Sequence, residues 1–510
     1  MSTAAGTATQ TEHLDLDTAV REILNHRPAV GFAVGVVRDG ELESFAAHGL
    51  ADIATRRSVT EDTVFRVASI TKTFTAIAVM QLVERGLVEL DAPAGAYLRA
   101  YALVPRSSGW PPATVRQLLT HTAGVPEQLP RSGMLRRDFG ESVAAGRPVP
   151  PLAEYYRGRL PLDAEPGTRF RYTNHGPATL GQIVEDITGR PLDGYLAEHV
   201  FAPLGMADTT LDRSDVDPSR AATGYTVGRC GARAVPVREK VTVGAAAAWS
   251  TPRDMGRYLS ALLGGGNNAH GTVLQPATLA AMFDAQYRPD PRIPGMGLGF
   301  WRRNLDGHRA VEHQGVTPGF DSQLFAAPDD GVGVIAFTNG ARQGGFWLPT
   351  ETERLLARRL GVPPPAVRTD VPEHPDVWGD LCGWYYLPGP PSDVQVRTAF
   401  GAGLEVFIRH GRLHARCLTP VPQLVKGVPL RPDDPEDPYV FRLELMEPGL
   451  FPTRLVFSQQ SGAGTTAVHL DFMPLSAYKR PAATNPRRWA TGAALVAGAT
   501  AIAIGRRHDT

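Results

Sequence analysis

Ser69 and Lys72, three positions apart, carry the side chains of an activated nucleophile and its base. Residues with this spacing share one face of a helix, so the hydroxyl and the amine can come within hydrogen-bond distance. A serine hydroxyl attacks a carbonyl carbon when a base removes its proton, and lysine acts as that base when burial or nearby cations keep its amine neutral. Arginine stays protonated and cannot do this. Only four of the 52 basic residues are lysines, and one of them stands here.

The same spacing also occurs in other contexts. A lone Ser-x-x-Lys is more often a helix cap followed by a solvated lysine. A second match, from Ser476 to Lys479, runs directly into Arg480 and Pro481, and proline there leaves no room for a helix. The spacing alone therefore makes Ser69 and Lys72 a candidate pair and does not establish catalysis.

The element that must position this pair is a helix that begins beside it. Apolar residues recur at helical spacing from Phe74 to Val83, and Gly86 follows as a stop signal. Ser69 and Lys72 are therefore predicted on the first turn of a buried helix, where unpaired backbone N–H groups favour negative charge.

Strand signals lie on both sides of a helical middle region. Residues 30–37 and 42–49 flank an Asp39-Gly40 turn, which predicts a β-hairpin. Four further strands and a last helix are predicted at residues 296–301, 310–313, 322–327, 332–338 and 351–360. We therefore expect an α+β fold, in which an antiparallel sheet with strands from distant sequence is flanked by helices and receives an inserted all-helical region.

The composition changes after residue 361. Residues 14–361 are predicted to form the larger domain, preceded by a disordered tail at residues 1–13. Residues 362–377 read as a proline-rich linker. Residues 378–480 alternate between apolar and polar side chains in short runs, which predicts a small all-β, barrel-like domain.

Bulk composition bounds the partners and the compartment. The 510 residues carry a formal net charge of +0, so we expect no binding to nucleic acid. The N-terminus lacks the basic start and apolar core of a secretory signal, and three cysteines are too few for a disulfide framework. We expect a cytoplasmic protein. Residues 489–505 are apolar and flanked by arginine pairs but shorter than the ~20 residues that usually span a bilayer, so membrane association through this segment stays open.

Three motifs in order, Ser69-Ile70-Thr71-Lys72, Tyr172-Thr173-Asn174 and His313-Gln314-Gly315, give the chain a family resemblance. With them the chain resembles the serine β-lactamase-like superfamily. Within it the chain resembles most the class C β-lactamase-related, penicillin-binding protein-like branch, which also contains D-stereospecific peptidases and esterases. The resemblance covers roughly residues 15 to 360. Three further short segments, at residues 118–124, 166–170 and 203–206, also match the sequence pattern of this branch.

The resemblance implies an acyl-enzyme mechanism. Ser69 would attack the substrate carbonyl, and Lys72 and Tyr172 would share the proton transfers, with one or the other as general base. The backbone N–H groups of Ser69 and Val316 would hold the oxyanion, and Asn174 would orient the substrate.

One motif departs from the pattern of β-lactamases, which carry Lys-Thr-Gly on the strand beside the nucleophile. Here His313 and Gly315 occupy that motif and are expected to line the substrate site, a form seen in esterase-like members. A histidine that is largely neutral at pH 7 holds a substrate carboxylate more weakly than a lysine does. We therefore expect a serine hydrolase that acts on small carboxylic esters or amides.

Other functions stay open. An acyltransferase would use the same site and pass the acyl group to an alcohol or amine, and a D-amino-acid peptidase or weak β-lactamase would differ in substrate. A non-catalytic homologue would bind ligands through the β domain. The sequence holds neither the G-x-S-x-G elbow of α/β-hydrolases nor an H-E-x-x-H metal motif, and we expect no metal and no cofactor.

Overall fold

The computed structural model describes residues 15–127, 140–341, 347–363, 367–390, 393, 396–397, 400–419, 422–444, 453–460 and 464–487. The predicted tail at 1–13 and the apolar segment at 489–505 lie outside these residues, as do positions 364–366 of the predicted linker. The predicted domain boundaries stay predictions.

The larger part of the chain is built on a seven-stranded antiparallel sheet with the strand order β12-β13-β14-β15-β1-β2-β3. β1 pairs with β2 on one side and with the distant β15 on the other. The predicted sheet with strands from distant sequence is thereby confirmed. The strands are β1 (Gly31–Arg38), β2 (Glu41–Asp52), β3 (Arg57–Ser58), β12 (Trp301–Leu305), β13 (His308–Thr317), β14 (Phe320–Ala327) and β15 (Val332–Thr338).

The β1–β2 hairpin follows from its turn residues. Asp39 and Gly40 connect the paired residues Arg38 and Glu41 and have φ angles of 50° and 85°. A two-residue turn with both φ angles positive matches the twist of the strands it joins, and Asp-Gly accepts those angles readily. The hairpin predicted about this dipeptide is present.

Helices cover both faces of the sheet. α1 (Leu16–His26) and α10 (Trp347–Arg359) pack their apolar side chains on one face. α8 (Pro252–Leu263) packs on the other face, against β1 and β15. Its first turn is capped by Thr251, whose hydroxyl accepts the backbone N–H of Asp254, and proline occupies the first helical position.

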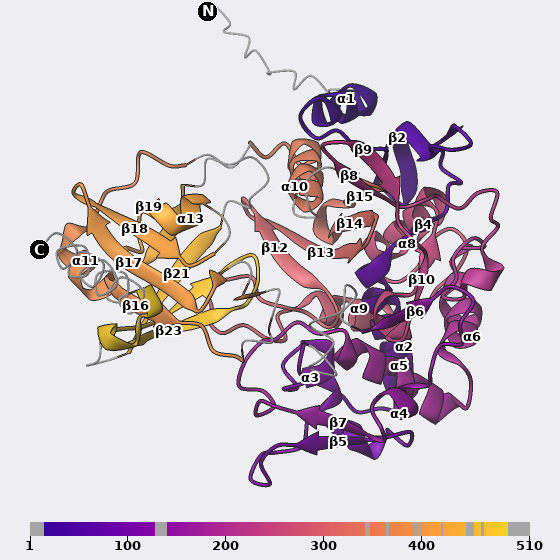
Figure 1. Cartoon of the computed structure of the whole chain (residues 1–510), viewed down its shortest axis with the longest axis horizontal. Helices are drawn as coiled ribbons and strands as arrows, with labels where there is room; N and C mark the ends of the chain where they lie inside the picture. The colour runs from indigo at the N-terminus through magenta and orange to yellow at the C-terminus, as the bar shows by residue number, and fades with distance from the viewer. Residues whose placement is uncertain are drawn as a thin grey trace, which may run out of the picture.

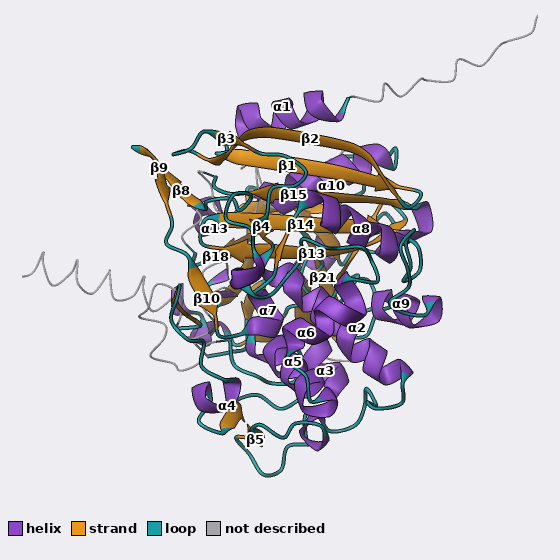
Figure 2. Cartoon of the chain, turned by 90° about the vertical axis from the view of Figure 1, so that its right-hand side faces the viewer, coloured by secondary structure: helices purple, strands orange, loops and turns teal. Residues whose placement is uncertain are grey.

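The helical region lies below the sheet in Figure 2 and surrounds α2 (Thr71–Glu84). Every residue of α2 from Thr71 to Leu82 is buried, so this helix forms the centre of the region. The other helices are α3 (Val115–Leu119), α4 (Leu152–Tyr155), α5 (His175–Thr188), α6 (Leu192–Leu196), α7 (Val243–Ala246) and α9 (Pro276–Phe283). Short strand pairs connect them: β4 (Phe65–Arg66) with β11 (Trp249–Ser250), β5 (Ala102–Pro105) with β7 (Arg159–Leu162), β6 (Ser142–Ala144) with β10 (Arg238–Lys240), and β8 (Tyr225–Gly228) with β9 (Gly231–Ala234).

A closed eight-stranded barrel forms the C-terminal part, on the left in Figure 1. Its apolar core continues across the junction into Phe170, Met296 and Trp301 of the larger part. The strands are β16 (Gly383–Tyr386), β17 (Gly403–Arg409), β18 (Arg412–Cys417), β19 (Val428–Pro432), β20 (Val440–Leu443), β21 (Arg454–Gln460), β22 (Gly464–Leu470) and β23 (Ser476–Arg480), with α11 (Pro375–Leu381) and α13 (Pro422–Lys426) beside them. The predicted fold class, α+β with a C-terminal all-β domain, is confirmed.

One predicted strand begins later than expected. Residues 296–301 alternate like a strand, but β12 starts at Trp301. A Cβ on Gly297 would overlap the Met282 carbonyl oxygen, and Gly299 has a φ of 79° and lies against Ala76 of α2. The glycines therefore serve a tight connection against α9 and α2. None of the helices in the described ranges has both the length and the apolar character that crossing a membrane requires.

Candidate active site

The candidate nucleophile lies in a tight turn that leads into α2. Ser69 is the middle residue of a 3₁₀ turn, Ala68–Ile70, directly before α2, rather than on the first α-helical turn. Ala68 adopts a φ of 45°, which costs free energy for a residue with a side chain. Thr71 holds the turn, since its hydroxyl donates to the Ala68 carbonyl at 2.6 Å and accepts the Ala248 N–H at 3.0 Å.

The Lys72 amine is surrounded by three acceptors. It lies 2.8 Å from the Ser69 Oγ, 2.8 Å from the Asn174 Oδ1 and 3.0 Å from the Ala245 carbonyl oxygen. Burial lowers the pKa of Lys72 to about 7, an effect opposed by the charge of Glu141 and increased by that of Lys240. A substantial fraction of the amine is therefore neutral near pH 7 and able to accept the serine proton.

Tyr172 lies over the same amine. Its ring centroid is 4.9 Å from the Lys72 Nζ, and the ring stacks on Trp301 at 5.9 Å. Burial raises the pKa of Tyr172 above its usual value, and interaction with the Ser69 hydroxyl only partly opposes this. The phenol thus keeps its proton near pH 7, which suits it to donate a proton rather than to remove one.

His313 borders the site as a neutral side chain. It is 1 % exposed, its ring centroid lies 6.5 Å from that of Tyr172, and its Nδ1 lies 2.8 Å from the Gln314 carbonyl oxygen. Burial and the charge of Lys72 lower the pKa of His313 to about 3. The imidazole is therefore uncharged at neutral pH and places no cation at this position.

Gly315 brings strand β13 against the nucleophile turn. A Cβ at this position would overlap the Val67 carbonyl oxygen and the Ser322 hydroxyl. Ser322 on the neighbouring β14 donates to that same carbonyl at 2.9 Å. The absence of a side chain at Gly315 thus lets two strands contact the residue that lies two positions before Ser69.

Strand β13 extends beyond its neighbour β12 beside the site. β12 pairs with β13 only as far as Glu312, so among the described strands the stretch from His313 to Thr317 pairs with β14 alone. Val316 lies on this stretch and is 52 % exposed. Its backbone N–H stays a predicted oxyanion donor.

Three site residues carry no signal that identifies their role in the sequence. Glu141 accepts a hydrogen bond from the Asn174 Nδ2 at 2.7 Å. Ala245 contributes only its backbone carbonyl to Lys72. His121 is buried with its ring centroid 4.7 Å from that of Tyr172, and burial lowers its pKa well below the usual value. His121 lies within residues 118–124, a segment that supports the family resemblance. The sequence therefore pointed to this segment but not to a role for His121.

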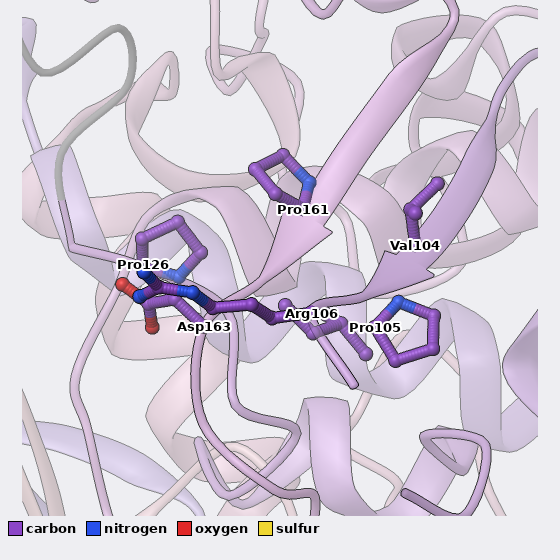
Figure 3. A pocket seen from close by; sticks show the side chains of 7 residues that line it. Val104, Pro105, Arg106, Pro126, Pro161 and Asp163 are labelled. Atoms are coloured by element: carbon purple, nitrogen blue, oxygen red, sulfur yellow. The ribbon is translucent and has the colours of Figure 1, made fainter. Parts of the chain in front are cut away.

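A separate cavity of about 340 Å³ lies near the strand pair β5–β7 (Figure 3). The Arg106 side chain extends toward Asp163 in this view. Pro126, also in the lining, accepts a hydrogen bond from the Thr173 hydroxyl at 2.8 Å. The lining residues are Val104, Pro105, Arg106, Pro126, Pro161, Leu162 and Asp163. Because this set lacks a nucleophile with a base, we place the candidate active site at Ser69.

Solved structures share this architecture. The octameric penicillin-binding protein homologue from Pyrococcus abyssi superimposes with a TM-score of 0.58 at 22% sequence identity, covering 90% of this chain and 98% of that one. The structure of SurE gives a TM-score of 0.57 at 23% identity and covers 91% of this chain and 98% of its own. At these identities the likeness concerns the fold, and it extends over both parts of the chain.

Relatives of this chain match its larger part in amino-acid sequence. Esterase EstB from Burkholderia gladioli is 31% identical over 367 residues, which cover 64% of this chain and 91% of the esterase. Penicillin-binding protein 4 from Amycolatopsis lactamdurans is 29% identical over 355 residues, covering 67% of this chain and 88% of its own. The Beta-lactamase family model matches residues 16–358, a range that holds Ser69, Lys72 and Tyr172, and the chain belongs to the Beta-lactamase family.

Proposed function

We propose that this protein is a serine hydrolase that cleaves small carboxylic esters or amides through an acyl-enzyme on Ser69. The observation that carries the proposal is the 2.8 Å contact between the Ser69 hydroxyl and a buried Lys72 amine whose pKa is lowered to about 7. Similarity to an esterase over most of that relative's length supports the same chemistry.

The protonation states assign the proton transfers. Neutral Lys72 removes the Ser69 proton as the serine oxygen attacks the carbonyl carbon. The resulting ammonium donates hydrogen bonds to the Asn174 Oδ1 and the Ala245 carbonyl oxygen. Tyr172, a phenol at neutral pH, donates its proton to the leaving group. The Lys72 ammonium then returns a proton to the Tyr172 oxygen. Water then attacks the acyl-enzyme and releases the acid, with the same groups acting in reverse.

The substrate class follows from the missing cation on β13. His313 is buried and neutral, so the strand offers a substrate carboxylate no charged partner there. This supports uncharged esters or amides over substrates that need a carboxylate held beside the scissile bond.

The test uses the intact mass of the full chain after incubation with a fluorophosphonate, together with turnover of a p-nitrophenyl ester panel, on wild type and Ser69→Ala. We expect one adduct and ester turnover on wild type alone. Folded wild type that gives neither adduct nor turnover would overturn the proposal. Added alcohols or amines distinguish transfer from hydrolysis, since an acyltransferase would form the acylated acceptor in preference to the free acid.

A further inference from the structure

We propose that Glu141 is a positioning residue of the Ser69 site: it fixes the Asn174 amide that binds Lys72, and it supplies the negative charge that faces the Lys72 amine. The inference rests on the proposed function and deepens it. It concerns a carboxylate that none of the three motifs includes.

The first observation is the direction of the Asn174 amide. Its Oδ1 accepts from the Lys72 amine at 2.8 Å, while its Nδ2 donates to the Glu141 Oε2 at 2.7 Å. An amine and a carboxylate on opposite ends of one amide leave a single orientation that satisfies both. Glu141 therefore determines that the oxygen of Asn174, and not its nitrogen, faces Lys72.

The second observation is how firmly Glu141 is held. Its side chain is 5 % exposed, and its Oε1 lies 3.5 Å from the Nε2 of His175. The Nδ1 of His175 lies 3.0 Å from the Tyr156 hydroxyl. With a proton on Nε2, His175 accepts from Tyr156 at Nδ1, and its Nε2 faces Glu141 without a hydrogen bond. The backbone carbonyl of Glu141 accepts the Val241 N–H at 2.9 Å, which fixes the main chain, and the Asn174 Nδ2 donates to the buried carboxylate.

The third observation is the charge around Lys72. Of the groups that face it, Glu141 is the acid that raises the Lys72 pKa, and Lys240 on β10 is the base that lowers it. His121 and His313 both have lowered pKa values, and Tyr172 has a raised one, so these three are uncharged near neutrality. An anion, Glu141 directly before β6, and a cation, Lys240 on the paired strand β10, thus act on the amine with opposite sign.

The sign of the expected effect follows directly. Without the Glu141 charge, the Lys72 ammonium is less stable and loses its proton at lower pH. Without the Lys240 charge, the ammonium is more stable and loses its proton at higher pH. Because the neutral amine is the base, the acidic limb of the pH profile for kcat/KM moves with the pKa of Lys72.

The experiment measures kcat/KM for a p-nitrophenyl ester against pH on the full chain. Glu141→Gln keeps an oxygen that can accept from Asn174 and removes the charge, so we expect the acidic limb to move about one unit or more toward lower pH. Lys240→Gln is expected to move it toward higher pH. Glu141→Asp keeps the charge but shortens the side chain that contacts the Asn174 amide. We expect its acidic limb at the same pH as in wild type, with a lower kcat. Glu154→Gln on the exposed surface of α4 serves as the matched control.

A folded Glu141→Gln variant with the wild-type limb would overturn the inference, because a merely structural carboxylate predicts that result. Should Glu141→Gln fail to fold by circular dichroism, Glu141→Asp decides: a limb shifted away from that of wild type contradicts the assigned charge. Fluorophosphonate labelling of wild type separates the two proposals. Unlabelled wild type refutes the hydrolase itself, whereas labelled wild type with an unmoved limb in Glu141→Gln refutes only the role of Glu141.

Discussion

Asp393 of the C-terminal barrel region lies 3.4 Å from Arg171, the residue directly before Tyr172. The two side chains are 8 % and 5 % exposed, and Arg171 also pairs with Asp163 of the larger part. Tyr172 itself stacks on Trp301, which belongs to the apolar cluster shared with the barrel. The backbone that carries Tyr172 is therefore held from the barrel side by both charge and packing.

Asp393→Asn should weaken this hold, because it leaves the buried Arg171 with one carboxylate instead of two. Removing one partner of a buried ion pair typically costs about 3–5 kcal/mol, and we expect a smaller loss in the free energy of unfolding because Asp163 remains. We also expect kcat to fall. Urea unfolding and ester kinetics measure both effects, with Glu436→Gln on an exposed barrel position as control. Unchanged stability and unchanged kcat would show that the barrel does not support Tyr172 through this contact.

Lys72→Arg should abolish ester turnover while leaving the protein folded. Arginine keeps the positive charge and much of the length but cannot give up its proton to become a base. We expect kcat to fall by roughly three orders of magnitude or more, as for loss of other members of a nucleophile–base pair. The exposed Lys426→Arg is the matched control. Substantial turnover by folded Lys72→Arg would contradict the assignment of Lys72 as base.

Tyr172→Phe removes a hydroxyl and keeps the ring that stacks on Trp301 and lies over the Lys72 amine. We therefore expect little change in melting temperature and a fall in kcat of about 10²- to 10⁴-fold, the usual contribution of a positioned proton donor. Steady-state ester kinetics and thermal melts provide the measurement, and Tyr478→Phe on the barrel surface provides the control. If kcat is retained, the leaving group receives its proton from elsewhere.

Gly315→Ala should separate β13 from the nucleophile turn. The added methyl group would overlap the Val67 carbonyl oxygen and the Ser322 hydroxyl, so the strand must shift away from Ser69. We expect a lower melting temperature and slower fluorophosphonate labelling of Ser69. Gly95→Ala is the matched control, since a Cβ there has nothing within 4 Å. Equal labelling rates for the two variants would show that the close approach of β13 is dispensable.

The Ser69–Lys72 contact could be predicted because it is local: the two residues are three apart, and the apolar pattern of the following helix is continuous. The hairpin about Asp39 and Gly40 was predictable for the same reason. The strand at residues 296–301 was placed too early because alternation alone does not show that Gly297 and Gly299 lie against neighbouring backbone and side chains.

Glu141 could not be predicted because its role arises from a contact across 33 residues. It stands in a stretch mixing proline, glycine and arginine without helical or strand periodicity. Ala245 contacts Lys72 through its backbone carbonyl, a group that every residue carries. The residue type at position 245 therefore cannot indicate this role. The protonation states of Lys72 and Tyr172, which the sequence left interchangeable as bases, depend on burial that only the packed structure defines.

The contact between Ser322 and Val67 also constrains when the site can exist during synthesis. These residues are 255 positions apart, and the strand that carries Gly315 is made long after Ser69 has left the ribosome. A nascent chain that ends within the helical region has its serine and lysine but lacks the two strands that hold the turn before them. Nucleophilic reactivity should therefore appear abruptly once β13 and β14 have emerged and paired, which makes labelling of Ser69 a reporter of the completed sheet.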